Sequence, residues 1–157
     1  MAEHTTMDEF REIISRLRAE DGCPWDRAQT HQSLRTCMME EASEFVASVQ
    51  IYEDTGYNEN MIEELGDMLL QVVMHAQIAS EEGRFTLDDV IDCVGEKMIR
   101  RHPHVFGTKD ADSPEKALSN WKEEKRKEKE ARTWKEMSKE ETMNEGMKYL
   151  KMAYEKH

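Results

Sequence analysis

Two short acidic clusters are the residues of this chain best suited to bind a divalent cation. Glu40, Glu41 and Glu44 form an E-E-x-x-E pattern, and Glu64 and Asp67 form an E-x-x-D pattern. Acids three residues apart lie on one face of a helix. If the two segments are antiparallel neighbouring helices, the carboxylates of both patterns can converge between them. Converging carboxylates repel one another unless a cation lies among them, so the pattern indicates a site for Mg²⁺ or Mn²⁺, which prefer oxygen ligands.

The same acids also have a purely structural interpretation. Acidic residues near the start of a helix favour the helix dipole, and E-E-x-x-E is a common pattern on solvated faces. A helical wheel places Glu64 and Asp67 beside the apolar stripe of their helix, with Gln71 and His75 continuing that polar edge. The wheel places the acids of the first cluster away from their own stripe, in solvent. We expect His75 to be a hydrogen-bonded residue of the core or of a pocket edge rather than a metal ligand.

Apolar residues repeat at helical spacing along most of the chain, and no segment predicts a strand convincingly. Gly83 and Pro103 are expected to stop helices, and Ser113-Pro114 is typical of a helix start. The segment 102–113 is predicted to be a loop, and Lys135–His157 only a weak helix that frays. We therefore expect an all-α fold, a small bundle of about five helices per chain that a second subunit completes. The predicted helices cover approximately residues 6–18, 33–52, 60–81, 86–102 and 113–132.

Composition excludes several classes of protein. The chain has 157 residues, the size of one domain, and a formal charge of -12 from 34 acidic and 22 basic residues. This charge disfavours binding to nucleic acid, and no uncharged segment is long enough to cross a membrane. The acidic N-terminus lacks the apolar stretch of a secretory signal. Three cysteines without a C-x-x-C pair suit reduced thiols, so we expect a cytoplasmic protein.

Taken together, five sequence motifs resemble the MazG family of nucleoside triphosphate pyrophosphohydrolases. The resemblance extends from about Phe10 to Lys129, in the family's order and with similar spacing. The R-R-H-P-H-V-F segment is far more specific than either acidic pattern alone. The motifs are C-P-W-D at residues 23–26, Q-T-H at 29–31, E-E-x-x-E at 40–44, E-x-x-D at 64–67 and E-K-M-I-R-R-H-P-H-V-F at 96–106.

The resemblance implies an all-α enzyme that binds Mg²⁺, for which Mn²⁺ can substitute. It implies Glu41, Glu44, Glu64 and Asp67 as metal ligands, and Glu40 and Glu41 as catalytic residues, with Glu40 outside the metal ligands or orienting the attacking water. The implied reaction cleaves a nucleoside triphosphate between the α and β phosphates, which yields a nucleoside monophosphate and pyrophosphate. A noncatalytic nucleotide sensor built on the same fold is the alternative.

The resemblance also implies that four residues of the later part of the chain bind phosphate or substrate: Lys97, Arg101, Trp121 and Lys125, with Arg100 less clearly assigned. Lys97 and Arg101 are four residues apart, hence on one helix face. Basic residues at the end of a helix also simply complement its dipole, and Trp121 has the alternative of anchoring a charged helix to the core.

We expect residues 1–132 to form a MazG-like pyrophosphohydrolase domain and residues 133–157 a C-terminal helical tail. The expected partners are nucleoside triphosphates and a second copy of the chain, because the family's site is usually built at a subunit contact. A di-iron carboxylate bundle is disfavoured, because it requires Glu-x-x-His pairs and Val72 stands three residues before His75.

Overall fold

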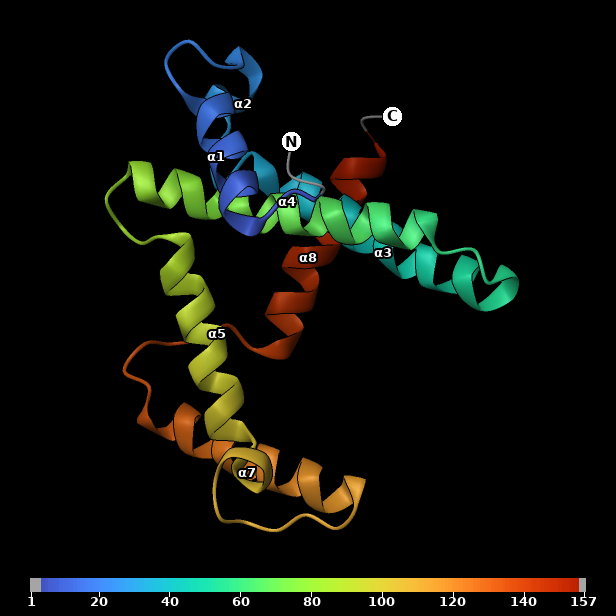
Figure 1. Ribbon diagram of the computed structural model, residues 1–157, viewed down its shortest axis with the longest axis vertical. Coiled ribbons are helices and arrows are strands. Elements are labelled where there is room, and N and C mark those ends of the chain that lie inside the picture. Colours follow the sequence, from blue (N-terminus) through green and yellow to red (C-terminus); the bar gives the residue numbers. More distant parts are fainter. Residues whose placement is uncertain (1–3, 156–157) are drawn as a thin grey trace. The chain divides into compact units, whose positions relative to one another are not determined.

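A computed structural model describes residues 4–155, and within this range the chain is helical with no strand. The all-α prediction is therefore confirmed for the described residues. None of these helices is long and apolar enough to cross a membrane. In chain order (Figure 1) the helices are α1 (Met7–Arg18), α2 (Pro24–Ala28), α3 (Leu34–Thr55), α4 (Glu59–Glu81), α5 (Leu87–Arg101), α6 (Pro103–Phe106), α7 (Pro114–Ala131) and α8 (Lys139–Tyr154).

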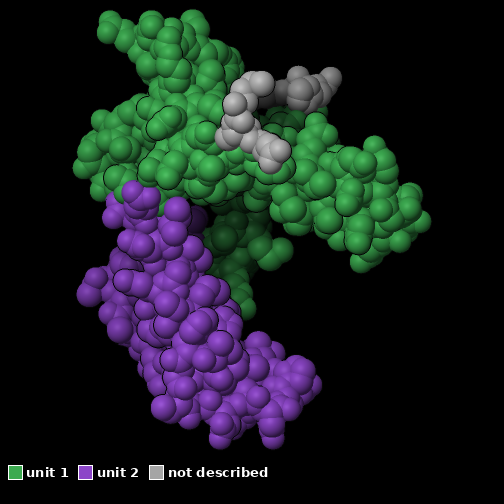
Figure 2. All heavy atoms as spheres, in the orientation of Figure 1, with its two compact units in different colours: residues 1–87, 138–157 green, residues 88–137 purple. Residues whose placement is uncertain are grey.

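The chain divides into two compact units, which Figure 2 colours green and purple. Unit 1 consists of residues 1–87 and 138–157, and it contains helices α1 to α4 and α8. Unit 2 consists of residues 88–137, and it contains α6, α7 and all of α5 after its first residue.

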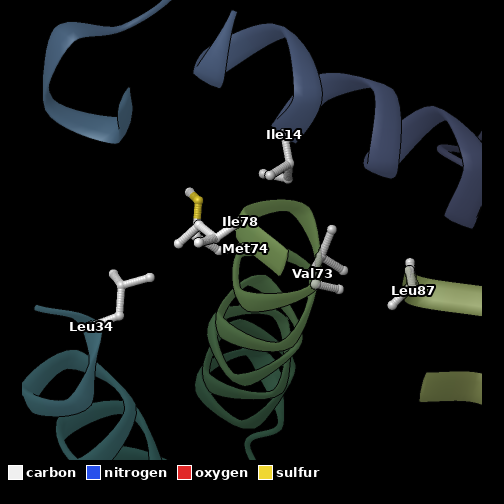
Figure 3. Packing of buried hydrophobic residues seen from close by; sticks show 7 residues of the cluster. Ile14, Leu34, Val73, Met74, Ile78 and Leu87 are labelled. Atoms are coloured by element: carbon white, nitrogen blue, oxygen red, sulfur yellow. The ribbon is translucent and has the colours of Figure 1, made fainter. Parts of the chain in front are cut away.

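Helix α4 is the centre of unit 1, and α1 and α3 pack against it. The core cluster contains Ile14 from α1, Leu34 from α3, and Val73, Met74 and Ile78 from α4, among others (Figure 3). Met74 and Ile78 of α4 are four residues apart and lie on one face of the helix. Ile14 and Val73 each retain 1% of their accessible surface, so both side chains are fully buried in unit 1, where α1 packs on α4.

A tight turn joins α1 to α2, and it depends on a glycine. The N–H of Gly22 donates to the carbonyl of Ala19, and the N–H of Cys23 donates to the carbonyl of Leu17. A Cβ atom at position 22 would lie 2.3 Å from the carbonyl oxygen of Leu17. Arg18 fixes the segment that follows, because its guanidinium donates to backbone carbonyls of that segment and to the carboxylate of Glu81 on α4.

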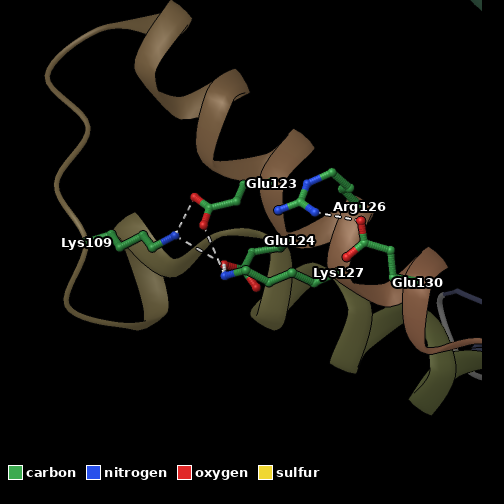
Figure 4. A network of polar contacts seen from close by, with 6 residues as sticks. All are labelled: Lys109, Glu123, Glu124, Arg126, Lys127 and Glu130. Atoms are coloured by element: carbon green, nitrogen blue, oxygen red, sulfur yellow. Dashed lines mark hydrogen bonds and ion pairs between the residues drawn. The ribbon is translucent and has the colours of Figure 1, made fainter.

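Unit 2 is held together mainly by polar contacts between α7 and its neighbours. Across residues 88–137, all of which are described, the buried residues are Arg101 and Asn120. The side chain of Asn120 donates to the carbonyl of Asp110. Figure 4 shows ion pairs made by α7, in which Lys109 and Lys127 both contact Glu123 and Glu124, and Arg126 pairs with Glu130.

Three features differ from the sequence-based expectations. Helices α2 and α6 are single short turns that begin with a proline, and periodicity does not detect elements of this length. Helix α8 is well formed rather than weak: Ser138 and Glu141 make a reciprocal capping box, and Ala153 is buried. The reason is tertiary, because α8 packs on α3. The end of the expected tail, residues 156–157, lies outside the described residues.

Candidate metal centre

The structure brings three of the four predicted ligand carboxylates together. One oxygen from each of Glu41, Glu64 and Asp67 lies within 4.8 Å of the other two. Glu41 comes from α3, and the other two acids come from α4. These three oxygens are close enough to surround a single divalent cation, and an all-oxygen set suits Mg²⁺ or Mn²⁺.

The convergence follows from the hairpin that α3 and α4 form. Gly56 caps the C-terminus of α3 with a left-handed φ of 72°, and the N–H of Gly56 donates to the carbonyl of Tyr52. Helix α4 begins at Glu59, so the connection is short and the two helices pack side by side (Figure 1). This packing brings Glu41 of α3 next to Glu64 and Asp67 of α4.

Glu41 is the acid whose environment opposes ionisation most. The pKa of Glu41 is raised to about 7, first by burial and then by the charges of the surrounding carboxylates, in the order Asp67, Glu44, Glu40 and Glu64. A cluster whose acids destabilise one another in this way gains stability when a cation neutralises it. The electrostatics of the cluster therefore fit a metal site better than a solvated acidic face.

Glu64 is nearly buried, at 9% exposure, and one further side chain orients it. The side-chain amide of Asn60 donates to Oε1 of Glu64 at 2.8 Å. The sequence analysis missed Asn60. The signal that could have found it is its position four residues before Glu64, which puts both side chains on one helix face. The hydrogen bond leaves the second oxygen of Glu64 for a cation.

The remaining acids of the first cluster lie at its edge. Glu44 is exposed and is not one of the three converging carboxylates, although its charge contributes to the pKa of Glu41. Glu40 is half-buried. Glu41 is half-buried as well, against the helical-wheel expectation of solvent, because the wheel of α3 ignores the surface that α4 supplies.

A polar edge continues along α4 from the acids, as the helical wheel predicts. Gln71 is buried, and its Oε1 atom has no hydrogen-bond partner among residues 4–155. His75 makes a hydrogen bond with His31, with their Nδ1 atoms 2.8 Å apart and the ring planes 2° apart. Burial lowers the pKa of His75, and the charge of His31 lowers it further. His75 is thus a hydrogen-bonded pocket-edge residue, as expected.

A cavity of about 420 Å³ lies directly beside Asp67, between α4 and the start of α1. This volume is in the range of small-molecule sites. Its walls are mostly apolar, and its lining residues are Thr5, Thr6, Met7, Phe10, Gly66, Asp67, Leu69 and Leu70.

The predicted phosphate-binding residues all lie in unit 2, and three of them meet at one aromatic ring. The guanidinium carbon of Arg101 is 5.0 Å from the centroid of the Trp121 ring, and Nζ of Lys125 is 4.7 Å from it. Lys97 is half-buried on α5, one turn before Arg101. Arg101 is buried and bonded to Glu128 of α7, a partner that the sequence analysis did not identify.

Comparison with known proteins finds similarity to the family that the sequence motifs resemble. Residues 29–106 match the MazG nucleotide pyrophosphohydrolase domain. The chain is 52% identical to the uncharacterized protein YabN of Bacillus subtilis over 76% of this chain and 24% of that protein. It is 48% identical to the nucleoside triphosphate pyrophosphohydrolase/pyrophosphatase MazG of Thermotoga maritima over 78% of this chain and 45% of that protein. It is 39% identical to the nucleoside triphosphate pyrophosphohydrolase of Escherichia coli K12 over the same shares. The chain spans less than half the length of each of these relatives.

Proposed function

Because residues 29–106 make this chain a member of the MazG nucleotide pyrophosphohydrolase family, we propose that it hydrolyses nucleoside triphosphates to nucleoside monophosphate and pyrophosphate. The observation that carries the proposal is the convergence of Glu41, Glu64 and Asp67 within 4.8 Å of one another. In this reaction a water oxygen attacks the phosphorus of the α phosphate, and the α–β anhydride bond breaks with pyrophosphate as the leaving group.

The reaction is proposed to depend on Mg²⁺, with Mn²⁺ as a substitute. Glu41, Glu64 and Asp67 would hold the cation, and Glu44 would join them from the rim of the cluster. When bound, Mg²⁺ neutralises phosphate charge and lowers the pKa of a coordinated water. Glu40 is proposed to orient the attacking water. Asn60 holds Glu64 in place through the bond to Oε1, so this ligand needs little reorganisation when it binds a cation.

Lys97, Arg101, Trp121 and Lys125 are proposed to contact substrate phosphates. The support is that three of them gather at one indole ring, where the aromatic face stabilises the two cations. Phosphoryl chemistry relies mainly on positioning and on stabilisation of negative charge, which such a cluster provides.

A second copy of the chain is the proposed partner. The support is an exposed apolar stripe along α4, at the spacing of one helix face, that a packed dimer would cover. The stripe consists of Ile62 (63% exposed), Leu65 (49%), Leu69 (38%) and Val72 (37%).

We also propose that the reaction takes place in the cytoplasm. The support is that the three cysteines are free thiols.

The decisive experiment is product analysis of the purified chain with a panel of ribonucleoside and deoxyribonucleoside triphosphates, in Mg²⁺ and in EDTA. Monophosphate and pyrophosphate that form only with the metal are the expected products, and their rates rank the bases. Diphosphate and orthophosphate would contradict the assigned scissile bond. A folded protein that binds Mg²⁺ and turns over no nucleotide would favour the nucleotide sensor.

A further inference from the structure

One carboxylate of unit 2 contacts both arginines at the end of α5. Oε1 of Glu128 accepts from Nε of Arg100 at 2.7 Å. Oε2 of Glu128 accepts from Nε of Arg101 at 3.0 Å and from Nη2 of Arg101 at 2.5 Å. The Arg101 and Glu128 side chains are 7% and 13% exposed, so little solvent screens this contact.

Glu128 is ionised throughout the physiological range. The pKa of Glu128 is lowered to about 2: the hydrogen bonds from Arg101 lower it most, burial opposes this shift, and Arg100 also lowers it. A permanent negative charge therefore lies against the two guanidinium groups, while Lys125 and Arg101 share the Trp121 ring close by.

The contact with Glu128 uses the donors that an oxyanion would use. A guanidinium binds a phosphate through pairs of N–H groups along one edge, and the edge formed by Nε and Nη2 of Arg101 is taken by Glu128. Nε of Arg100 is taken in the same way. A phosphate that binds Arg101 along this edge must displace the carboxylate, and one that binds elsewhere on the guanidinium remains close to its charge.

We propose that Glu128 is an internal competitor for phosphate, which weakens the binding of polyphosphate to Arg100 and Arg101 and so favours the release of pyrophosphate. This inference rests on the proposed function, which assigns Arg101 to the substrate phosphates. Glu128 also holds the guanidinium groups in place, which by itself would favour binding. The benefit of fixing a side chain is independent of the ligand, however, whereas repulsion grows with ligand charge, and a polyphosphate carries several charges.

The test is the affinity of the full-length chain for inorganic tripolyphosphate, measured by calorimetry in EDTA. Without a cation the acidic cluster of unit 1 repels the anion, so binding reports on the basic residues. Glu128→Gln is expected to bind tripolyphosphate about tenfold more tightly than the unchanged chain, with a steeper dependence on salt. Glu130→Gln is the matched control, because Glu130 pairs with Arg126 on the exposed side of the same helix, and its affinity should be unchanged.

Equal, weaker or absent binding by a folded Glu128→Gln variant would overturn the proposal. Circular dichroism establishes whether the variant folds. If it does not, the unchanged chain provides a second test, because displacement of Glu128 must shift the NMR signals of the Arg100 and Arg101 Nε–H groups when tripolyphosphate binds. Signals that stay in place at saturation would also overturn the proposal. Nucleotide turnover by the unchanged chain is measured separately, so failure of the proposed function is distinguishable from failure of this inference.

Discussion

The two units of this chain are stabilised by different forces. Unit 1 buries an apolar cluster in which α4 is packed by α1 and α3, and its acids lie at the edge of that rigid hairpin. In unit 2 the two buried residues, Arg101 and Asn120, are polar, and apolar side chains of α5 such as Ile91 and Ile99 are about half exposed.

This difference teaches where each kind of chemistry can be placed. A metal site needs carboxylates held within a few tenths of an ångström, and the side-by-side packing of α3 and α4 supports that precision. Phosphate binding tolerates movement and depends on charge, so it is compatible with a unit that ion pairs hold together. The contrast predicts that substitutions in unit 1 and unit 2 will differ in the property they change.

The largest expected effect is on activity when one carboxylate of the cluster is neutralised. Asp67→Asn should lower Mg²⁺-dependent turnover by roughly a hundredfold or more, because a metal ligand loses its charge without a change of volume. The helical circular dichroism spectrum should be unchanged. Asp54→Asn, near the exposed end of α3, is the control, and its turnover should match the unchanged chain. Full activity in Asp67→Asn would remove Asp67 from the ligand set.

The next largest effect is on stability, and it sharpens the comparison of the two units. Ile14→Ala leaves a cavity in the core of unit 1 and should lower the free energy of unfolding by about 2–5 kcal/mol. Ile99→Ala, at a position that is 55% exposed, should lower it by less than about 1 kcal/mol. Urea denaturation measures both. Similar losses for the two variants would show that unit 2 also relies on apolar burial.

A smaller effect concerns pH, and it is confined to unit 2. The pKa of Glu128 is lowered from 4.5 to about 2 by the Arg101 hydrogen bonds, so its contribution to stability is present above pH 4.5 and is lost as the pH falls toward 2. The contribution is at most about 3 kcal/mol. Urea denaturation should show that Glu128→Gln is less stable than the unchanged chain at pH 6, and that the difference shrinks by pH 3. A constant difference between these pH values would contradict the assignment.

The smallest effect tests the hydrogen bond that orients Glu64. Asn60→Ala should weaken Mg²⁺ binding about tenfold, because Glu64 then loses its fixed orientation. Asn58→Ala is a matched control, since Asn58 precedes α4 and makes no side-chain capping bond. Calorimetric titration with Mg²⁺ compares the two, and equal affinities would assign Asn60 a role in folding alone.

Sequence patterns predicted the helical hairpin and most of its acids, because both depend on local spacing. The apolar repeat of α4 predicted its length closely, and the two acidic patterns predicted the meeting of Glu41 with Glu64 and Asp67. The half-burial of Glu41 could not be predicted from the wheel of α3, since it depends on the neighbouring helix.

Contacts between distant residues had no local signal. The bond between Arg101 and Glu128 joins residues 27 positions apart, and within a dense run of charges no periodicity marks one glutamate above the others. The packing of α8 on α3 could not be predicted for the same reason. Arg35 forms an ion pair with Glu145 and lies over the ring of Tyr149, and both of these residues are far from it in the sequence. The sequence alone therefore predicted elements and local faces better than it predicted partners.

The turn at Gly22 has a consequence for how this protein can vary. Any other amino acid would place its Cβ atom 2.3 Å from a backbone oxygen, and backbone cannot move aside as a flexible side chain can. A Cβ atom added at Gly66 or Gly95, in contrast, would have no atom within 4 Å apart from the nearby backbone of its own helix. In a library that samples all amino acids at each glycine and is selected for folded protein, position 22 should return glycine alone, while alanine should be recovered freely at positions 66 and 95.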